Sequence, residues 1–198
     1  MYNVIFLGSF NPPHNGHVAC IKSLVDNCKD VGEVCVIPAW QNPNKSASIE
    51  FTHRYNMTCR AFEGIPNVVV SEIESVVKPK NTYELFSYIK ENVFHSFKWA
   101  ITEETILEII EGKWVNSESL LKENNFLLLH VGNIDNLSKV IRDNPIIKDK
   151  IEYVELKGSL CVCHSTDIRK SIVQNIGLEK GLLNESVLEY INQNNLYK

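Results

Sequence analysis

Residues 8–17 read GSFNPPHNGH, and they follow an apolar stretch, Asn3–Leu7, that is typical of a buried strand. Gly8 lacks a Cβ, so the backbone there could approach a ligand closely. Gly16 removes bulk at the point where a helix over about residues 17–27 is predicted to begin. Because the unpaired N–H groups of a helix start attract anions, this strand, loop and helix predict a phosphate site at the edge of an α/β sheet.

Two histidines stand in this segment. His14 and His17 are three residues apart, so at a helix start they share one face. Two imidazoles beside free backbone amides form a set of hydrogen-bond donors that suits phosphates and the charge that develops during their transfer. A pair of surface histidines in a proline-rich turn and a metal-chelating pair are the alternatives, and the glycine and proline framing favours the phosphate site.

A second segment of similar chemistry lies near the other end of the chain, where residues 164–171 read HSTDIRKS. Ser165 or Thr166 is predicted to cap a helix after the last strand, with Arg169 near the helix start. Small hydroxyl groups and a guanidinium at a helix start form an anion site. The alternative is an ordinary helix cap with one surface arginine.

Apolar, β-branched runs alternate with helix-like stretches along the whole chain. Continuous apolar strands separated by helices indicate a parallel sheet covered on both faces, a doubly wound, Rossmann-like α/β fold. We expect one domain over residues 1–198, with C-terminal helices from about residue 165 packed on the sheet. The predicted strands are 3–7, 33–37, 68–70, 97–101, 126–131 and 151–156, and the predicted helices are 17–27, 50–63, 82–92, 104–111, 117–123, 137–142, 166–175 and 185–194.

The first segment resembles the Gly-x-Phe-(Asp/Asn)-Pro-x-His-x-Gly-His signature of the nucleotidylyltransferase superfamily, and the second resembles its Ser-Ser-Thr-x-Ile-Arg motif. The resemblance implies transfer of a nucleotidyl group from ATP, with Mg²⁺ on the polyphosphate. It places His14, His17 and Arg169 at the reacting phosphates. It assigns the ATP site to Gly8, Ser9, Phe10, His14, Gly16, His17, Ser165, Thr166 and Arg169.

Further stretches are similar to the nicotinate or nicotinamide mononucleotide adenylyltransferases. The run Asn42-Pro43-Asn44-Lys45 resembles their Pro-His-Lys loop, so Lys45 would contact substrate phosphates and join the catalytic set. In the segment that resembles their pyridine pocket, Trp114 would stack on the pyridine ring, although a core tryptophan fits the pattern equally. With these, the residues that the resemblance places at the mononucleotide are Ser9, Phe10, Lys45, Thr82, Glu104 and Trp114.

Several positions depart from the family pattern. Asn44 replaces a histidine, Thr102-Glu103-Glu104 replaces Gly-x-Asp, and His164 replaces the first serine of the second motif. Glu103 and Glu104 would disfavour the extra carboxylate of nicotinate mononucleotide and so favour nicotinamide mononucleotide. The motifs resemble those of bacterial members, which favours nicotinate, so both acceptors stay open. The alternatives are a phosphopantetheine adenylyltransferase, a cytidylyltransferase or a non-catalytic nucleotide sensor; all three would keep the same phosphate site.

Charge and composition exclude other classes. A net charge of −4 argues against a protein that coats nucleic acid. The resemblance implies small-molecule partners, ATP and a pyridine mononucleotide. No apolar run has membrane-spanning length, and the N-terminal residues do not read as a signal peptide, so we expect a cytoplasmic protein without a membrane partner. The six cysteines are irregularly spaced and predict buried thiols, with no protein-bound metal. A homo-oligomer is compatible with the sequence.

Overall fold

The computed structural model describes residues 1–41, 49–156, 163–174, 176–177 and 181–198. Its centre is a six-stranded parallel sheet in the order β3-β2-β1-β4-β5-β6. The strands are β1 (Tyr2–Gly8), β2 (Val31–Pro38), β3 (Val68–Val70), β4 (Phe97–Thr102), β5 (Asn125–His130) and β6 (Ile151–Glu155). This doubly wound order confirms the predicted fold class.

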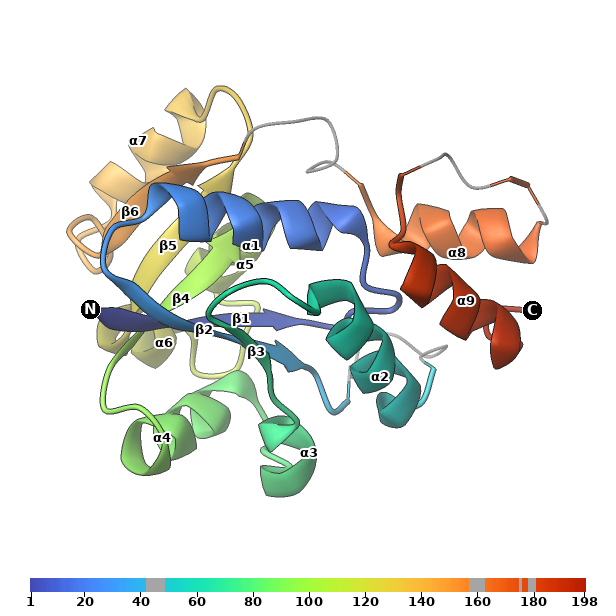
Figure 1. Cartoon of the computed structure of the whole chain (residues 1–198). Coiled ribbons are helices and arrows are strands. Elements are labelled where there is room, and N and C mark those ends of the chain that lie inside the picture. The colour runs from blue at the N-terminus through green and yellow to red at the C-terminus, as the bar shows by residue number, and fades with distance from the viewer. Residues whose placement is uncertain (42–48, 157–162, 175, 178–180) are drawn as a thin grey trace.

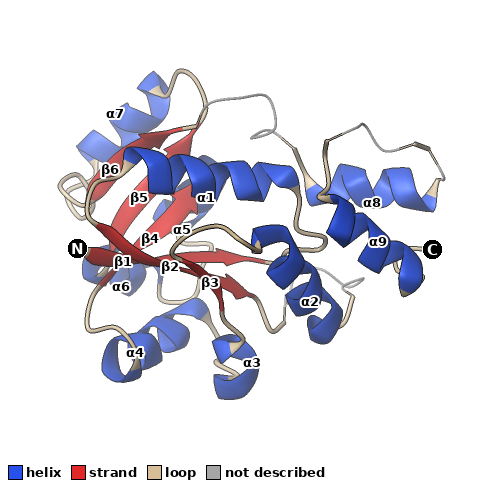
Figure 2. Cartoon of the chain, in the orientation of Figure 1, coloured by secondary structure: helices blue, strands red, loops and turns tan. Residues whose placement is uncertain are grey.

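Helices cover both faces of the sheet (Figures 1 and 2). They are α1 (Asn15–Asn27), α2 (Phe51–Phe62), α3 (Ile73–Val77), α4 (Thr82–Asn92), α5 (Glu103–Ile110), α6 (Ser117–Glu123), α7 (Asp135–Asp143), α8 (Ser165–Val173) and α9 (Glu185–Gln193). The predicted elements are all present, with ends that differ by at most two residues. The sequence analysis missed α3, because five residues are too few to show a helical period of apolar side chains.

Two cores form because alternate residues of each strand face opposite sides of the sheet. On one side, Val4 and Phe6 of β1 pack with buried residues of α1, α2 and α9. On the other side, Ile5 packs with buried residues of α4, α5, α6 and α7. Val187 and Ile191 of α9 are almost fully buried, so this C-terminal helix belongs to the first core.

The strand order reverses between β1 and β4, since β2 lies on one side of β1 and β4 on the other. In an open parallel sheet, this reversal at the carboxyl ends of the strands is the usual place for a ligand. Figure 1 shows β1 running from the N-terminus towards this edge, where the start of α1, α8 and α9 gather. The two motifs singled out by sequence therefore lie at the edge that the topology favours. No helix in the described part of the chain is long and apolar enough to cross a membrane.

Candidate active site

The segment after β1 turns sharply, and the turn is fixed by Phe10. Phe10 has a φ of +45° and its side chain is 1% exposed. Its ring folds back so that a Cβ added to Gly8 would lie 2.8 Å from Phe10 Cζ. The space that we expected a ligand to use beside Gly8 is therefore filled by the Phe10 ring. Since that ring is part of the core, any contact between Phe10 and a nucleotide is left to its backbone.

His14 and His17 lie together at the start of α1. His14 is the residue that precedes the helix, and the centroids of the two rings are 3.7 Å apart. The backbone N–H of His14 donates to Nδ1 of His17 over 3.1 Å. Because Nδ1 of His17 is the acceptor, the proton of the neutral ring is on Nε2, which is left as a donor.

Burial keeps both rings neutral. It lowers the pKa of His14 from 6.5 to about 4, with a further contribution from nearby His164. Burial also lowers the pKa of His17, and repulsion from His14 adds to this effect. Nδ1 of His14 is buried without a hydrogen-bond partner among the described residues. An anion bound beside these rings would raise both pKa values, because it would stabilise the protonated forms.

The two motifs are in direct contact, although more than 150 positions separate their contacting residues. Ser165 Oγ donates to the carbonyl oxygen of Pro12 over 2.9 Å. Arg169 Nη1 donates to the carbonyl oxygen of Asn11 over 2.6 Å. The geometry thus brings the start of α8 against the first motif, just before the start of α1.

The predicted cap of α8 is wrong. The capping position is His164, which makes no side-chain cap bond, and Ser165 and Thr166 are already inside the helix. Ser165 uses its hydroxyl on Pro12 instead, and Thr166 Oγ1 accepts from Arg169 Nη2 over 3.2 Å. The hydroxyl groups therefore join the helix to the first motif and to the guanidinium, and they leave the helix start without a side-chain cap.

Arg54 of α2 has a structural role. Its side chain is 2% exposed, and its three hydrogen bonds go to carbonyl oxygens. Nη1 donates to Ser9, Nη2 to Trp40 and Nε to Ile49, at 2.9 to 3.0 Å. Arg54 therefore ties the first motif to the residues after β2 and before α2.

The sequence analysis missed two further residues that contact the first motif or the residues after β2. Glu74 Oε2 accepts from the backbone N–H of Trp40 over 2.9 Å, and burial raises its pKa to about 7. The Tyr197 hydroxyl donates to Asn11 Oδ1 over 2.7 Å. Neither residue stands in a recognisable motif. The burial of Arg54 agrees with its place on one face of α2 with the buried residues Met57, Thr58 and Ala61.

The residues predicted to contact the mononucleotide lie less close together than those of the two motifs. Trp114 packs edge-on against Trp99, at 5.8 Å between ring centroids, and its Nε1 donates to Glu108 Oε2. Thr82 opens α4, and Glu104 is exposed in the first turn of α5. Lys45 lies outside the described residues. In this conformation the Trp114 indole is engaged by the protein itself.

Comparison with known proteins gives consistent matches over almost the whole chain. A model of the cytidylyltransferase-like family matches residues 5–171. A protein of Thermosipho melanesiensis named as a probable nicotinate-nucleotide adenylyltransferase is 30% identical over 96% of this chain and 94% of its own length. One of Christiangramia forsetii with the same name is 30% identical over 98% of this chain and 97% of its own.

Solved structures resemble the fold. The nicotinic acid mononucleotide adenylyltransferase of Plasmodium falciparum, complexed with NaAD, has a TM-score of 0.81 at 23% identity, covering 100% of this chain and 98% of that one. Its complex with APC has a TM-score of 0.78 over the same shares of both chains, again at 23% identity. At this identity the likeness supports the architecture alone.

The lowered pKa of His14 makes the free energy of unfolding depend on pH. Unfolded His14 has a pKa near 6.5 and takes up a proton at pH 5, whereas the folded form, with a pKa of about 4, does not. We expect the free energy of unfolding to fall by roughly 2 kcal/mol between pH 7 and pH 5 from this residue alone. Urea unfolding at the two pH values measures the change. His14→Asn removes the titrating imidazole and places a favourable residue before the helix, so it should reduce the difference. An equal difference in both proteins would contradict the burial of a neutral His14.

Proposed function

The chain belongs to the cytidylyltransferase-like family and, within it, to the nicotinate-nucleotide adenylyltransferases, and from this premise we propose which residues carry the reaction. It is an adenylyltransferase of NAD biosynthesis, which transfers AMP from ATP to nicotinate or nicotinamide mononucleotide. A phosphate oxygen of the mononucleotide attacks the α-phosphorus of ATP, the bond to the β-phosphate oxygen breaks, and pyrophosphate leaves. The products are the dinucleotide and pyrophosphate.

One observation supports the assignment of residues most strongly: the contact between the two motifs. Because the nucleophile is already an anion, the protein needs no general base and no covalent intermediate. It needs donors that position two anions and stabilise the charge of the transition state. Two helix starts with His14, His17 and Arg169 between them supply such donors at the reversal of the sheet.

His17 is proposed as the donor to the phosphate whose charge grows in the transition state. The hydrogen bond from His14 N fixes the tautomer that carries the proton on Nε2. His14 stacks on this ring and limits how it can turn. Because both rings are neutral, they do not repel each other before the substrate binds. Their hydrogen bonds to the phosphate become stronger as negative charge develops there.

The remaining assignments follow the same chemistry. Arg169, with Ser165 and Thr166 beside it, is proposed to hold the polyphosphate of ATP, with Gly8, Ser9, Phe10 and Gly16 forming the backbone of that site. Lys45 is proposed to contact substrate phosphates, and Ser9, Phe10, Thr82, Glu104 and Trp114 to surround the mononucleotide. For Trp114 this requires the indole to leave Glu108 when the pyridine ring binds.

Mg²⁺ is proposed to enter with ATP. Within the two motifs the single carboxylate is that of Asp167, which is exposed and lies 3.8 Å from Lys170. A hard cation would therefore be held by phosphate oxygens and water, where it screens the like charges of the two substrates. Free thiols at Cys28, Cys35 and Cys59 support a reducing, cytoplasmic compartment, and a homo-oligomer stays a prediction.

Nicotinate mononucleotide is the proposed acceptor, because the relatives of Thermosipho and Christiangramia carry that substrate in their names. Glu103 and Glu104 at the start of α5 are the residues that would disfavour its carboxylate. The test measures pyrophosphate release with ATP and each mononucleotide at equal concentration. We expect the higher kcat/KM with nicotinate mononucleotide. A higher value with nicotinamide mononucleotide would reverse the acceptor assignment, and no release with either would contradict the proposed function.

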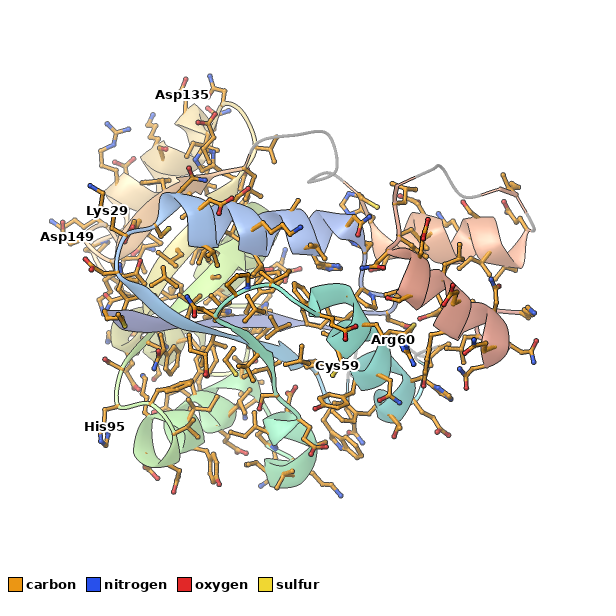
Figure 3. The ribbon with its side chains drawn as sticks, in the orientation of Figure 1. Lys29, Cys59, Arg60, His95, Asp135 and Asp149 are labelled. Atoms are coloured by element: carbon orange, nitrogen blue, oxygen red, sulfur yellow. The ribbon has the colours of Figure 1, made fainter. Side chains whose placement is uncertain are left out.

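Replacing the proposed donor should slow the chemical step. His17→Ala removes one donor to the transition state, so we expect kcat to fall roughly a hundredfold or more. His95→Ala is the matched control, because His95 is exposed at the opposite end of the molecule from α8 and α9 (Figures 1 and 3). Steady-state pyrophosphate release measures both variants. A variant in which KM rises while kcat stays at the wild-type value would show that His17 binds ground-state phosphate only.

A further inference from the structure

A residue beyond the last helix reaches into the first motif. After α9 the chain turns through Asn195 and Tyr197, which have φ values of +51° and +62°. Leu196 between them is 8% exposed and belongs to the core on the α1 side of the sheet. The turn directs Tyr197 so that its hydroxyl donates to Asn11 Oδ1 over 2.7 Å. A bulky residue in the left-handed region persists only where its surroundings hold it, and here the anchors are the Leu196 side chain and Asn11.

Asn11 is held from two sides. Its side chain is 3% exposed and accepts from Tyr197, while its carbonyl oxygen accepts from Arg169 Nη1 over 2.6 Å. The position of that carbonyl therefore sets where the guanidinium lies. Since a buried amide oxygen without a donor is unfavourable, loss of the Tyr197 hydroxyl would favour another orientation of Asn11.

Within the described residues, the hydrogen bonds of Arg169 go to neutral groups. Their acceptors are the Asn11 carbonyl and the Thr166 hydroxyl, and none of the described carboxylates forms an ion pair with this guanidinium. Burial raises the pKa of Tyr197, against the opposing effects of Arg169 and Arg54, so its hydroxyl stays a neutral donor. The described neighbours of Arg169 thus orient its positive charge and do not neutralise it, which suits a ligand that carries several negative charges.

We infer that Tyr197 is a positioning residue of the ATP site: through Asn11 it fixes the carbonyl that orients Arg169 towards the polyphosphate. This inference rests on the proposed function, because it takes Arg169 to be a phosphate ligand. It adds a residue from outside both motifs. It also explains why the chain beyond α9 packs back on the loop after β1.

The test compares two tyrosines that each lose one hydroxyl. Tyr197→Phe removes the donor to Asn11. Tyr190→Phe is the matched control, because Tyr190 is also half-buried and its hydroxyl bonds His53 and Asn56 of α2, away from Asn11. Calorimetric titration with Mg²⁺-ATP alone gives a dissociation constant that does not depend on the acceptor. Pyrophosphate release gives kcat, and thermal unfolding of both variants reports their stability.

We expect Tyr197→Phe to raise the dissociation constant of ATP about fivefold, the ratio for loss of one ordinary hydrogen bond, and to lower kcat. Tyr190→Phe should bind ATP as the wild type does, even where its melting temperature falls equally. In the Asn11→Ala background, Tyr197→Phe should have no further effect on ATP binding, because the two residues act in one chain of contacts. Equal ATP affinity in the two tyrosine variants, or additive effects of the double substitution, would overturn the inference.

Failure of the inference and failure of the proposed function are distinguishable. Wild-type protein that binds ATP but makes no dinucleotide from either mononucleotide would contradict the function, while the ATP titrations would still decide the role of Tyr197. Wild-type turnover with equal ATP affinity in the two variants would keep the function and remove Tyr197 from the site.

Discussion

The site depends on two hydrogen bonds that join the ends of the chain: those from Arg169 and Ser165 to the carbonyl oxygens of Asn11 and Pro12. They fix the start of α8 against the segment that leads into α1. Under the proposed function, this contact lets the two helix starts bind one ligand. Without them each helix start would be a weak, separate site at the edge of the sheet. The sheet order supplies the place, since its reversal leaves the loop after β1 open to such a partner.

A second arginine also supports this loop. Arg54 is almost fully buried, and it offsets the cost of burial by donating to three carbonyl oxygens. One of these belongs to Ser9, so the first motif is held at Ser9 by Arg54 and at Asn11 by Arg169. The two arginines differ in burial: Arg54 is enclosed and structural, whereas Arg169 is half-buried, as its proposed role at the polyphosphate requires.

Much of this arrangement was predictable from sequence, and the reasons differ between residues. The strands follow from continuous apolar runs, and the two phosphate motifs follow from Gly, Pro, His and Arg at fixed spacing in short segments. Local patterns could not show that the Phe10 ring fills the space beside Gly8, because that depends on a backbone turn with positive φ. Nor could they show that Ser165 bonds Pro12 instead of capping its own helix, since the competing acceptor comes from a distant part of the chain. Tyr197 and Glu74 escaped for the same reason.

The account rests on one shared phosphate site, and a single titration tests it directly. Protein labelled with ¹⁵N in histidine and arginine would be titrated with inorganic pyrophosphate while the ring signals of His14 and His17 and the Nε signal of Arg169 are followed by NMR. All three should shift along curves with one dissociation constant, and the exposed His95 should stay unchanged. If the histidine signals reach saturation while the Arg169 signal stays in place, or follows a different dissociation constant, the two motifs do not form one site.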